Sequence, residues 1–477
     1  MSLPLQLLDL AVVHFQTMKR SKANDETDSL CSKVHLERIL QIGLNSFLIY
    51  FAIYGFRKPW GAARFKGQRA LGMKLKDAFS MFQTLGYALG KVAGTFVVPL
   101  IPAEKTTKAL ALLPPVSVLF WFGFALSENS PGWMVFFMFL SATPLSFGWS
   151  LLYRKIEGRR TGDVLGAILS ASYIFASGFC KDMGRVVLNN GVSEAWMPLV
   201  TSLWFLLPIE LFIYLLQYVP PQTLDEVKVY SKRTKMPLKK QKQFFLQYWP
   251  GLSLYFLAYL LVTALRDYRD DFGVEIWHER TGEDVMPSFS ATESVIAIVV
   301  VVATACVFAV RTPRNAMLAY YLLTVVGMVL LFVVQLFPLE PHVWFVLTGI
   351  GIFFGYSAVS NLFDRMLGAL KFGNSTATLL INAADASGYA GTVVLLLYKN
   401  FYHSGGQDES GYYAYFLFMA DIVAVVGVVC FATSAVYMSR KVPTGALENP
   451  NVADETGDGE TTSSHTETDY IQLLDRP

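Results

Sequence analysis

Two arginines hold matching places in two apolar stretches, and their chemistry suits anion binding. Arg57 follows Tyr50 by seven residues and Tyr54 by three, so the three side chains share one face of a helix. Arg266 likewise follows Tyr259 by seven residues. Each guanidinium offers a planar fork of donors that fits a phosphate or carboxylate, and two guanidiniums repel each other unless an anion lies between them. The pattern predicts a site for a multivalent anion, with headgroup contacts for both arginines as the alternative.

Four further ionisable residues lie in or near apolar stretches, where an ionised side chain costs about 2.5–3.5 kcal/mol. Such a residue usually faces a water-filled cavity or a partner. Lys91, with Tyr87 four residues before it, lies too deep to reach the headgroups and is predicted to be a cavity cation. Asp385 is predicted to pair with a cavity cation, to carry a coupling proton or to have a structural partner. Asp271 and Glu293 are additional candidates for a coupling site or a cavity ion pair.

The remaining charges in apolar stretches favour structural interpretations. Lys181, Asp182 and Arg185 are predicted to form a salt-bridged turn that ends a span at the membrane interface. Glu210 and Asp421 are predicted to be structural carboxylates. The cysteines have neither metal-binding nor disulfide spacing, so they are predicted only to pack. They are Cys31, Cys180, Cys306 and Cys430.

The elements that must hold these residues are membrane-spanning helices. Of the 477 residues, 53% are hydrophobic and 16% are charged, whereas soluble domains carry about 25% charged residues. Apolar stretches of about 18 or more residues, each long enough to cross a bilayer core, recur along the chain. We therefore predict an all-α polytopic membrane protein with about twelve transmembrane helices. The predicted spans are 39–59, 77–100, 107–127, 132–153, 164–187, 196–219, 246–267, 291–310, 315–337, 342–363, 376–398 and 412–438.

The chain also repeats itself at an offset of 207 to 210 residues. The matching positions are Phe47, Leu48, Tyr50 and Arg57 with Phe256, Leu257, Tyr259 and Arg266; Phe147–Ser150 with Phe354–Ser357; and Ala176–Phe179 with Ala386–Tyr389. Repeated bundles with a binding site between them are a common plan of secondary transporters. The repeat predicts two pseudo-symmetric six-helix bundles, residues 39–219 and 246–438, with a duplicated channel or receptor scaffold as the alternative.

The distribution of charge predicts the orientation and the segments outside the bundles. Lysine and arginine concentrate in loops on one side, which places both termini in the cytoplasm. Residues 1–38 are predicted to be a cytoplasmic segment, 220–245 a basic linker against anionic lipid, and 439–477 a disordered acidic tail. The first external loop is an exception to the charge rule. Its basic residues are Arg64, Lys66, Arg69, Lys74 and Lys76.

Several strings resemble a known family. Tyr50–Lys58 resembles the first-helix signature of the organophosphate:phosphate antiporters of the major facilitator superfamily, and Gly86–Lys91 resembles their second helix. Leu265–Arg266, followed five residues later by Asp271, is similar to their seventh helix. Arg57–Trp60 is also similar to a string in an uncharacterised group of major-facilitator-like proteins. In the antiporters, two arginines grip the substrate phosphate, and tyrosines and a lysine line the same cavity. The resemblance implies these roles for Tyr50, Tyr54, Arg57, Tyr87, Lys91 and Arg266.

Two departures from that family bear on the substrate. The loop at Pro102–Lys108 lacks the Gly, Asp and Arg signature that the superfamily carries between helices two and three. The antiporters' fifth-helix histidine has no counterpart, and Ser172 and Tyr173 are the nearest residues. The substrate, and phosphate exchange with it, therefore stay open.

The sequence contains no glycine-rich phosphate loop, nucleotide-binding domain or catalytic constellation. We therefore expect neither an enzyme nor a cofactor, a metal site or a nucleic-acid partner. Asn374–Thr376 fits a glycosylation acceptor but falls in a loop predicted to be cytoplasmic. Asp469–Leu474 fits tyrosine-based and dileucine sorting patterns, which suggests sorting adaptors as partners. The membrane, plasma or endosomal/vacuolar, stays open.

These observations predict a secondary active transporter that moves a small anionic solute by alternating access. An organophosphate or phosphate is the candidate solute, and membrane lipid is the surrounding partner. A non-transporting sensor or scaffold on the same fold is one alternative. A proton-coupled carrier of another small solute, neutral or cationic, is a further alternative, for which Asp385 is the best support.

Overall fold

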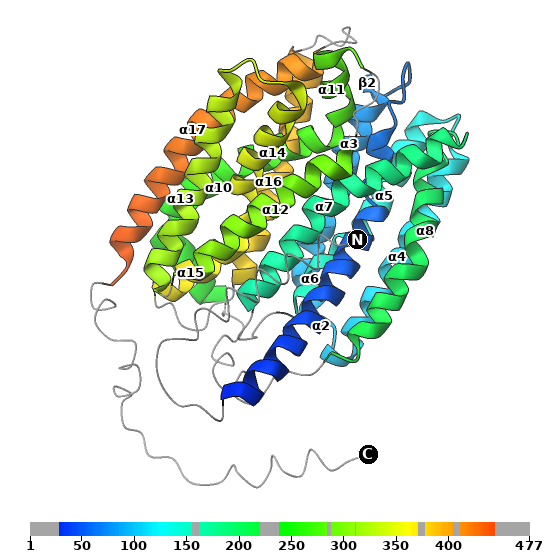
Figure 1. The fold of residues 1–477 in the computed structure, drawn as a ribbon. Coiled ribbons are helices and arrows are strands. Elements are labelled where there is room, and N and C mark those ends of the chain that lie inside the picture. The colour runs from blue at the N-terminus through cyan, green and yellow to red at the C-terminus, as the bar shows by residue number, and fades with distance from the viewer. Residues whose placement is uncertain are drawn as a thin grey trace, which may run out of the picture.

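The computed structural model describes residues 28–154, 156, 162–219, 238–283, 288–310, 312–370, 377–403 and 411–443. Nearly all of this described chain is helical. Figure 1 shows long helices that run alongside one another, with the start of α2 near one end and α11 at the other. The predictions for the N-terminal segment, the basic linker, the acidic tail, the glycosylation acceptor and the sorting string fall wholly or largely outside the described residues.

The helices form two sets of six long segments. The first set is α2 (Asp28–Gly55), α3 (Leu75–Val97), α4 (Thr106–Leu126), α5 (Pro131–Leu145) with α6 (Phe147–Tyr153), α7 (Gly162–Asn189) and α8 (Met197–Leu216). The second set is α10 (Leu238–Asp271), α12 (Phe289–Phe308), α13 (Pro313–Gln335), α14 (Pro341–Ser357) with α15 (Val359–Ala369), α16 (Ala377–Tyr398) and α17 (Tyr412–Lys441). In chain order these segments match the predicted spans. Nine segments of the described chain are long and apolar enough to cross a membrane, and the protein is an all-α polytopic membrane protein.

Short elements connect the long helices. A hairpin of β1 (Arg69–Ala70) and β2 (Met73–Lys74) pairs antiparallel just before α3. Its two turn residues, Leu71 and Gly72, have φ values of 54° and 80°, as a two-residue hairpin turn requires. The other connectors are η2 (Pro59–Ala62), η3 (Val98–Leu100), η4 (Ala103–Lys105), α11 (Gly273–Thr281) and η5 (Lys399–His403).

The two halves meet along two pairs of helices, α7 with α12 and α3 with α16. Small residues allow these contacts. A Cβ atom on Gly178 in α7 would lie 2.5 Å from the backbone oxygen of Phe289 in α12. Its counterpart in the repeat, Gly388 in α16, has the same constraint within the second half, because a Cβ there would lie 2.7 Å from the Thr263 side chain. The repeated glycine therefore marks close helix crossings in both halves.

Two of the spans are broken near the repeated Phe147–Ser150 and Phe354–Ser357 strings. The break between α5 and α6 falls at Ser146, two residues after Pro144, which cannot donate a helical hydrogen bond. The break between α14 and α15 follows Ser357, whose hydroxyl donates to the backbone oxygen of Phe353 at 2.7 Å. Such back-bonding by serine bends helices. Both breaks lie beside the cavity described next.

Candidate functional site

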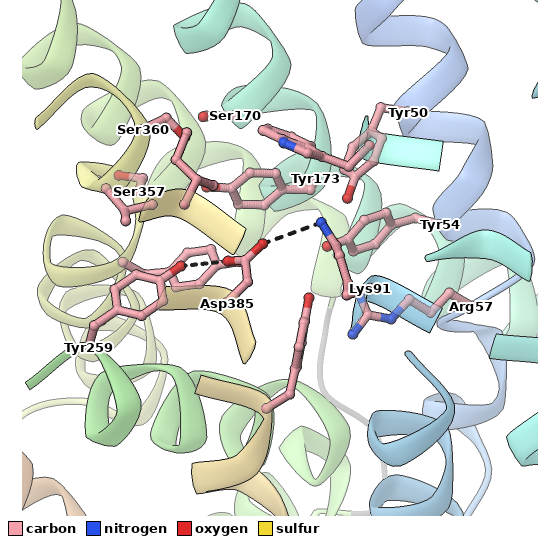
Figure 2. Close-up of a pocket in the computed structure, with 15 residues that line it drawn as sticks. Tyr50, Tyr54, Arg57, Lys91, Ser170, Tyr173, Tyr259, Ser357, Ser360 and Asp385 are labelled. Atoms are coloured by element: carbon pink, nitrogen blue, oxygen red, sulfur yellow. Dashed lines mark hydrogen bonds and ion pairs between the residues drawn. The ribbon is translucent and has the colours of Figure 1, made fainter. Parts of the chain in front are cut away.

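A cavity between the two halves gathers residues from helices of both sets (Figure 2). Its empty space amounts to about 440 Å³, which includes space open to solvent, and only a small part of it is wide enough for a water molecule. The cavity must therefore widen before a solute can enter. Its lining is Tyr50, Tyr54, Arg57, Lys91, Trp149, Ser170, Tyr173, Tyr259, Tyr356, Ser357, Val359, Ser360, Ile381, Asp385 and Tyr389.

Most residues expected at the site from the sequence lie in this lining. They are Tyr50, Tyr54, Arg57, Lys91, Tyr259 and Asp385. Tyr87 lies directly behind it, with its hydroxyl 3.4 Å from that of Tyr50. Arg266, Asp271 and Glu293 are not in the lining. Glu210 and Asp421, expected to be structural, are not in it either.

Arg57 is a buried cation held by aromatic rings. Its side chain follows the end of α2 and is only 3% exposed. Its guanidinium carbon lies 4.1 Å from the centroid of the Tyr87 ring and 5.7 Å from that of Tyr54. Gln83 donates to the backbone oxygen of Arg57 at 3.0 Å, which fixes the chain at this point. Among the described residues no carboxylate lies within 4.0 Å of the guanidinium, and its Nε has no acceptor.

That lack of an acid distinguishes Arg57 from the other buried charges. Fourteen lysine, arginine, aspartate and glutamate residues of the described chain are buried, and thirteen of them have an ionic partner. Arg57 is the fourteenth. Cation–π contacts are worth about 2 kcal/mol when desolvated, which is less than the cost of burying an unpaired ion. The cavity wall therefore carries one uncompensated positive charge.

Lys91 and Asp385 form an ion pair across the cavity. The Lys91 ammonium in α3 lies 3.3 Å from Asp385 Oδ2 in α16, so the pair joins the two halves (Figure 2). The Tyr259 hydroxyl in α10 donates to Asp385 Oδ1 at 3.1 Å. Lys91 also lies 6.0 Å from the centroid of the Tyr87 ring and 5.9 Å from that of Trp149. The same aromatic residue, Tyr87, thus lies beside both cavity cations.

Arg266 differs from its expected role. It pairs with the adjacent Asp267 at 2.5 Å, and its guanidinium carbon lies 3.8 Å from the centroid of the Tyr356 ring. Asp267 also accepts from the Thr392 hydroxyl at 2.9 Å. The structure therefore does not place Arg57 and Arg266 as two unpaired arginines around one anion site. Arg57 lines the cavity without an acid, and Arg266 lies behind Tyr356 with its charge compensated.

A second group of charges joins the halves at the end of the molecule that carries α11 (top of Figure 1). We call it the α11-end cluster. Its contacts are Lys58–Asp270 at 2.5 Å, Lys58–Asp271 at 2.7 Å, Lys76–Glu275 at 2.7 Å, Lys399–Asp77 at 3.0 Å, and Lys181–Asp270. Four lysines thus meet four carboxylates, and every contact crosses between the halves. The cluster is electrically balanced, unlike the cavity wall.

The α11-end cluster contains the ionic partner of Asp271. It overturns two predictions from the sequence, namely Asp271 as a member of a cavity ion pair and the salt-bridged turn at Lys181, Asp182 and Arg185. Asp271 accepts from Lys58 and, at 2.5 Å, from the Ser80 hydroxyl, so its ion pair lies outside the cavity. Lys181, Asp182 and Arg185 do not form an interfacial turn, because α7 continues to Asn189. Asp182 instead accepts from the backbone N–H groups of Phe289 and Ser290 at the start of α12. The guanidinium carbon of Arg185 lies 5.0 Å from the centroid of the Phe289 ring in α12, so all three side chains contact the other half.

Glu293 likewise has a partner outside the cavity. It accepts from Arg269 at 2.8 Å, and both residues belong to the second half. The Arg269 guanidinium also donates to the backbone oxygen of Phe345 at 3.1 Å. The pair connects α10, α12 and α14, which is a structural role within one half.

Solved structures with a similar arrangement of helices are transporters. A mutant form of the nucleoside transporter NupG has a TM-score of 0.54 at 13% identity, covering 83% of this chain and 99% of that one. The unmutated NupG gives 0.53 at 13% identity, with 83% and 98% covered. The human organic anion transporter MFSD10 (TETRAN) gives 0.48 at 12% identity, with 83% and 99% covered. The likeness to the two NupG structures shows that this polytopic membrane protein has the major facilitator fold.

The sequence also places the chain within one family. It belongs to DUF5690, described as a family of unknown function, which matches residues 59–441. No curated protein matches the sequence.

Proposed function

We propose that this protein is a secondary transporter that carries a small organic anion through the cavity between its halves. The single observation that carries the proposal is Arg57, a buried guanidinium in the cavity lining with no carboxylate partner among the described residues. Burying an ion without a partner costs several kcal/mol. A bound anion neutralises the guanidinium. Binding therefore removes the free-energy cost of the unpaired charge in the empty protein, and this gain strengthens the affinity for the solute.

The charges around the cavity define what kind of anion fits. Lys91 is matched by Asp385, and Arg266 is matched by Asp267, which leaves the charge of Arg57 in excess. One carboxylate balances that excess, whereas a phosphate monoester, with up to two negative charges at pH 7, balances it together with one proton. The resemblance to organophosphate:phosphate antiporters favours the phosphate ester. The absence of a second unpaired arginine in the lining favours a solute with a single charged group over one gripped from both halves.

The rest of the lining suits an organic body rather than a bare inorganic ion. Six tyrosines and Trp149 present rings and hydroxyls, and Ser170, Ser357 and Ser360 add hydroxyl groups. Rings provide stacking surfaces, while hydroxyls both donate and accept hydrogen bonds. This surface binds a solute that is partly apolar and partly hydroxylated.

A second candidate is an uncharged, ring-bearing solute such as a nucleoside. The aromatic lining favours it, and NupG, whose fold is similar, is described as a nucleoside transporter. This candidate leaves Arg57 without a counter-ion in the loaded state. We therefore rank it below the anion.

A thermal-shift screen of the purified full-length protein tests the proposal. The probes are glycerol 3-phosphate, 4-hydroxybenzoate, inorganic phosphate and uridine. A ligand that binds only the folded protein raises its stability by about 2.7 kcal/mol at one hundred times its dissociation constant. We expect a shift with an organic anion that is lost in Arg57→Gln and kept in the control Arg69→Gln, because Arg69 is exposed on the β-hairpin. A shift with uridine alone, unchanged in Arg57→Gln, would favour the second candidate.

A further inference from the structure

Asp385 supplies the negative charge that faces the second cavity cation, Lys91. Its carboxylate is the one acidic group among the lining residues that the structure describes, and it binds the second cavity cation, Lys91. We propose that the Asp385 carboxylate competes with the solute's anionic group for Lys91, an inference that rests on the proposed function. When the solute displaces it, Asp385 takes up one proton, so that each solute moves with a proton.

The geometry brings the solute's anionic group within reach of Lys91. The Arg57 guanidinium carbon and the Lys91 ammonium lie 4.1 Å and 6.0 Å from the centroid of the same Tyr87 ring. Both cations line the same cavity, so an anion that binds Arg57 occupies the space that Lys91 also faces. Coulomb attraction falls only as the inverse of distance, so this anion competes for Lys91 with the Asp385 carboxylate, which lies 3.3 Å from the ammonium.

Displacement leaves Asp385 with little to compensate its charge. Its partners in the described chain are Lys91 and Tyr259, and the Tyr259 hydroxyl alone would remain. Burial of a carboxylate without a cation is costly, and a proton removes that cost. The proton passes from a hydronium ion to Oδ2, the oxygen that Lys91 leaves, while Tyr259 still donates to Oδ1. When the solute departs, Lys91 returns and the proton is released to water.

The other charged groups near Asp385 are already engaged in the loaded cavity, because Arg266 pairs with Asp267 and Arg57 binds the solute. From α3 come Lys91 and Tyr87, and from α10 come Tyr259 and the Arg266–Asp267 pair. Tyr356 of α14 and Tyr389 of α16 itself add neutral phenols. From α15 the lining receives the Ser360 hydroxyl, whereas the charged residues of α15, Asp364 and Arg365, are not in the lining. The proton therefore falls to Asp385.

The same exchange loosens the contact between the halves. Lys91 belongs to α3 and Asp385 to α16, two helices that pack against each other across the interface. A loaded and protonated cavity lacks this ion pair. The α11-end cluster and the contacts of Asp182 with the start of α12 still join the halves.

Anion binding to the purified full-length protein, measured by calorimetry in two buffers of different ionisation enthalpy, tests this inference. The probe is 4-hydroxybenzoate, or glycerol 3-phosphate if the screen above favours it. We expect the wild type to take up close to one proton more per bound anion than Asp385→Asn does, a difference that cancels protonation of the probe. We also expect wild-type affinity to rise as the pH falls from 8 to 6. Asp385→Asn should bind more tightly at pH 8, with roughly tenfold less dependence on pH, and Asp385→Glu should restore that dependence.

The outcomes separate this inference from the function on which it rests. Binding that needs Arg57 but takes up no more protons in the wild type than in Asp385→Asn overturns the inference and leaves the proposed anion carrier intact. Weaker binding in Asp385→Asn, in a sample that unfolds as cooperatively as the wild type, also overturns it. No binding that depends on Arg57, with either probe, overturns the proposed function and the inference with it.

Discussion

The guanidinium carbon of Arg57 lies 4.1 Å from the centroid of the Tyr87 ring, and no carboxylate of the described chain lies within ion-pair distance of it. An aromatic face thus takes the place of an acid beside a buried cation. A ring stabilises the cation only partly, whereas an acid would neutralise it and remove its affinity for a solute. The arrangement keeps a positive charge available inside the protein.

Replacement of Arg57 should make the empty protein more stable. Arg57→Gln removes an uncompensated buried charge while keeping a polar, though shorter, side chain, so we expect a gain of roughly 1–3 kcal/mol in unfolding free energy. Thermal unfolding of the purified variant, without added solute, measures the change. The matched control is Arg269→Gln, which breaks the buried pair with Glu293 and should lower stability instead. A stability loss of equal size in both variants would contradict the assignment of Arg57 as unpaired.

The ring of Tyr87 should stabilise the charge of Arg57 specifically. Tyr87→Leu removes the aromatic face, and we expect a coupling of about 0.5–2 kcal/mol in a double-mutant cycle with Arg57→Gln. Tyr87→Phe keeps the ring and loses only the 3.4 Å contact between the Tyr87 and Tyr50 hydroxyls, so its effect should be small. Unfolding measurements on the single and double variants give the coupling. A value near zero would show that Tyr87 only fills space.

The α11-end cluster should depend on the pairing of its charges. The Lys76 side chain is 2% exposed and pairs with Glu275 at 2.7 Å, so Lys76→Gln leaves a buried carboxylate without its partner. We expect a loss of about 3–5 kcal/mol in unfolding free energy. The exchange of the two charges, Lys76→Glu with Glu275→Lys, should recover part of it. If Lys76→Gln unfolds at the wild-type temperature, the pair does not hold the halves together.

Gly178 should resist any side chain because α12 passes so close. A Cβ atom there would lie 2.5 Å from a backbone oxygen, which cannot turn away as a side chain can. Gly178→Ala should therefore cost about 1–3 kcal/mol, as overpacked cores do. Gly132→Ala is the control, because nothing lies within 4 Å of a Cβ at that helical position. Equal effects of the two substitutions on thermal unfolding would contradict the close crossing of α7 and α12.

Hydropathy and the internal repeat predict the long helices and their order, but neither α11 nor the breaks between α5 and α6 and between α14 and α15. The predicted span 39–59 corresponds to α2, which ends at Gly55. The predicted span 164–187 corresponds to α7, which extends from Gly162 to Asn189. The ends differ because termini depend on local features that hydropathy does not contain. The string Arg57–Trp60 includes a proline that starts η2, so the chain leaves the helix before the apolar stretch finishes.

The cavity was predictable in its residue types but not in its pairings. Deep charges such as Lys91 and Asp385 stand out, because each must have a partner or water inside a membrane. Their partners are less visible, since Lys399 and Asp77 lie 322 positions apart in the sequence. Asp267 went unrecognised as the partner of Arg266, because adjacent residues on a helix do not normally face each other. The basic residue Lys76, an exception to the charge rule, was a usable signal of the α11-end cluster.

Uptake into proteoliposomes tests the central role of Arg57 most directly. Liposomes are preloaded with unlabelled glycerol 3-phosphate or 4-hydroxybenzoate, and entry of the same labelled anion is followed for the wild type, Arg57→Gln and Arg69→Gln. Arg57 is buried in the cavity lining and Arg69 is exposed outside it. The account predicts entry with the wild type and Arg69→Gln, and at least a hundredfold slower entry with Arg57→Gln, the equivalent of about 2.7 kcal/mol. Entry at the wild-type rate with Arg57→Gln would contradict it.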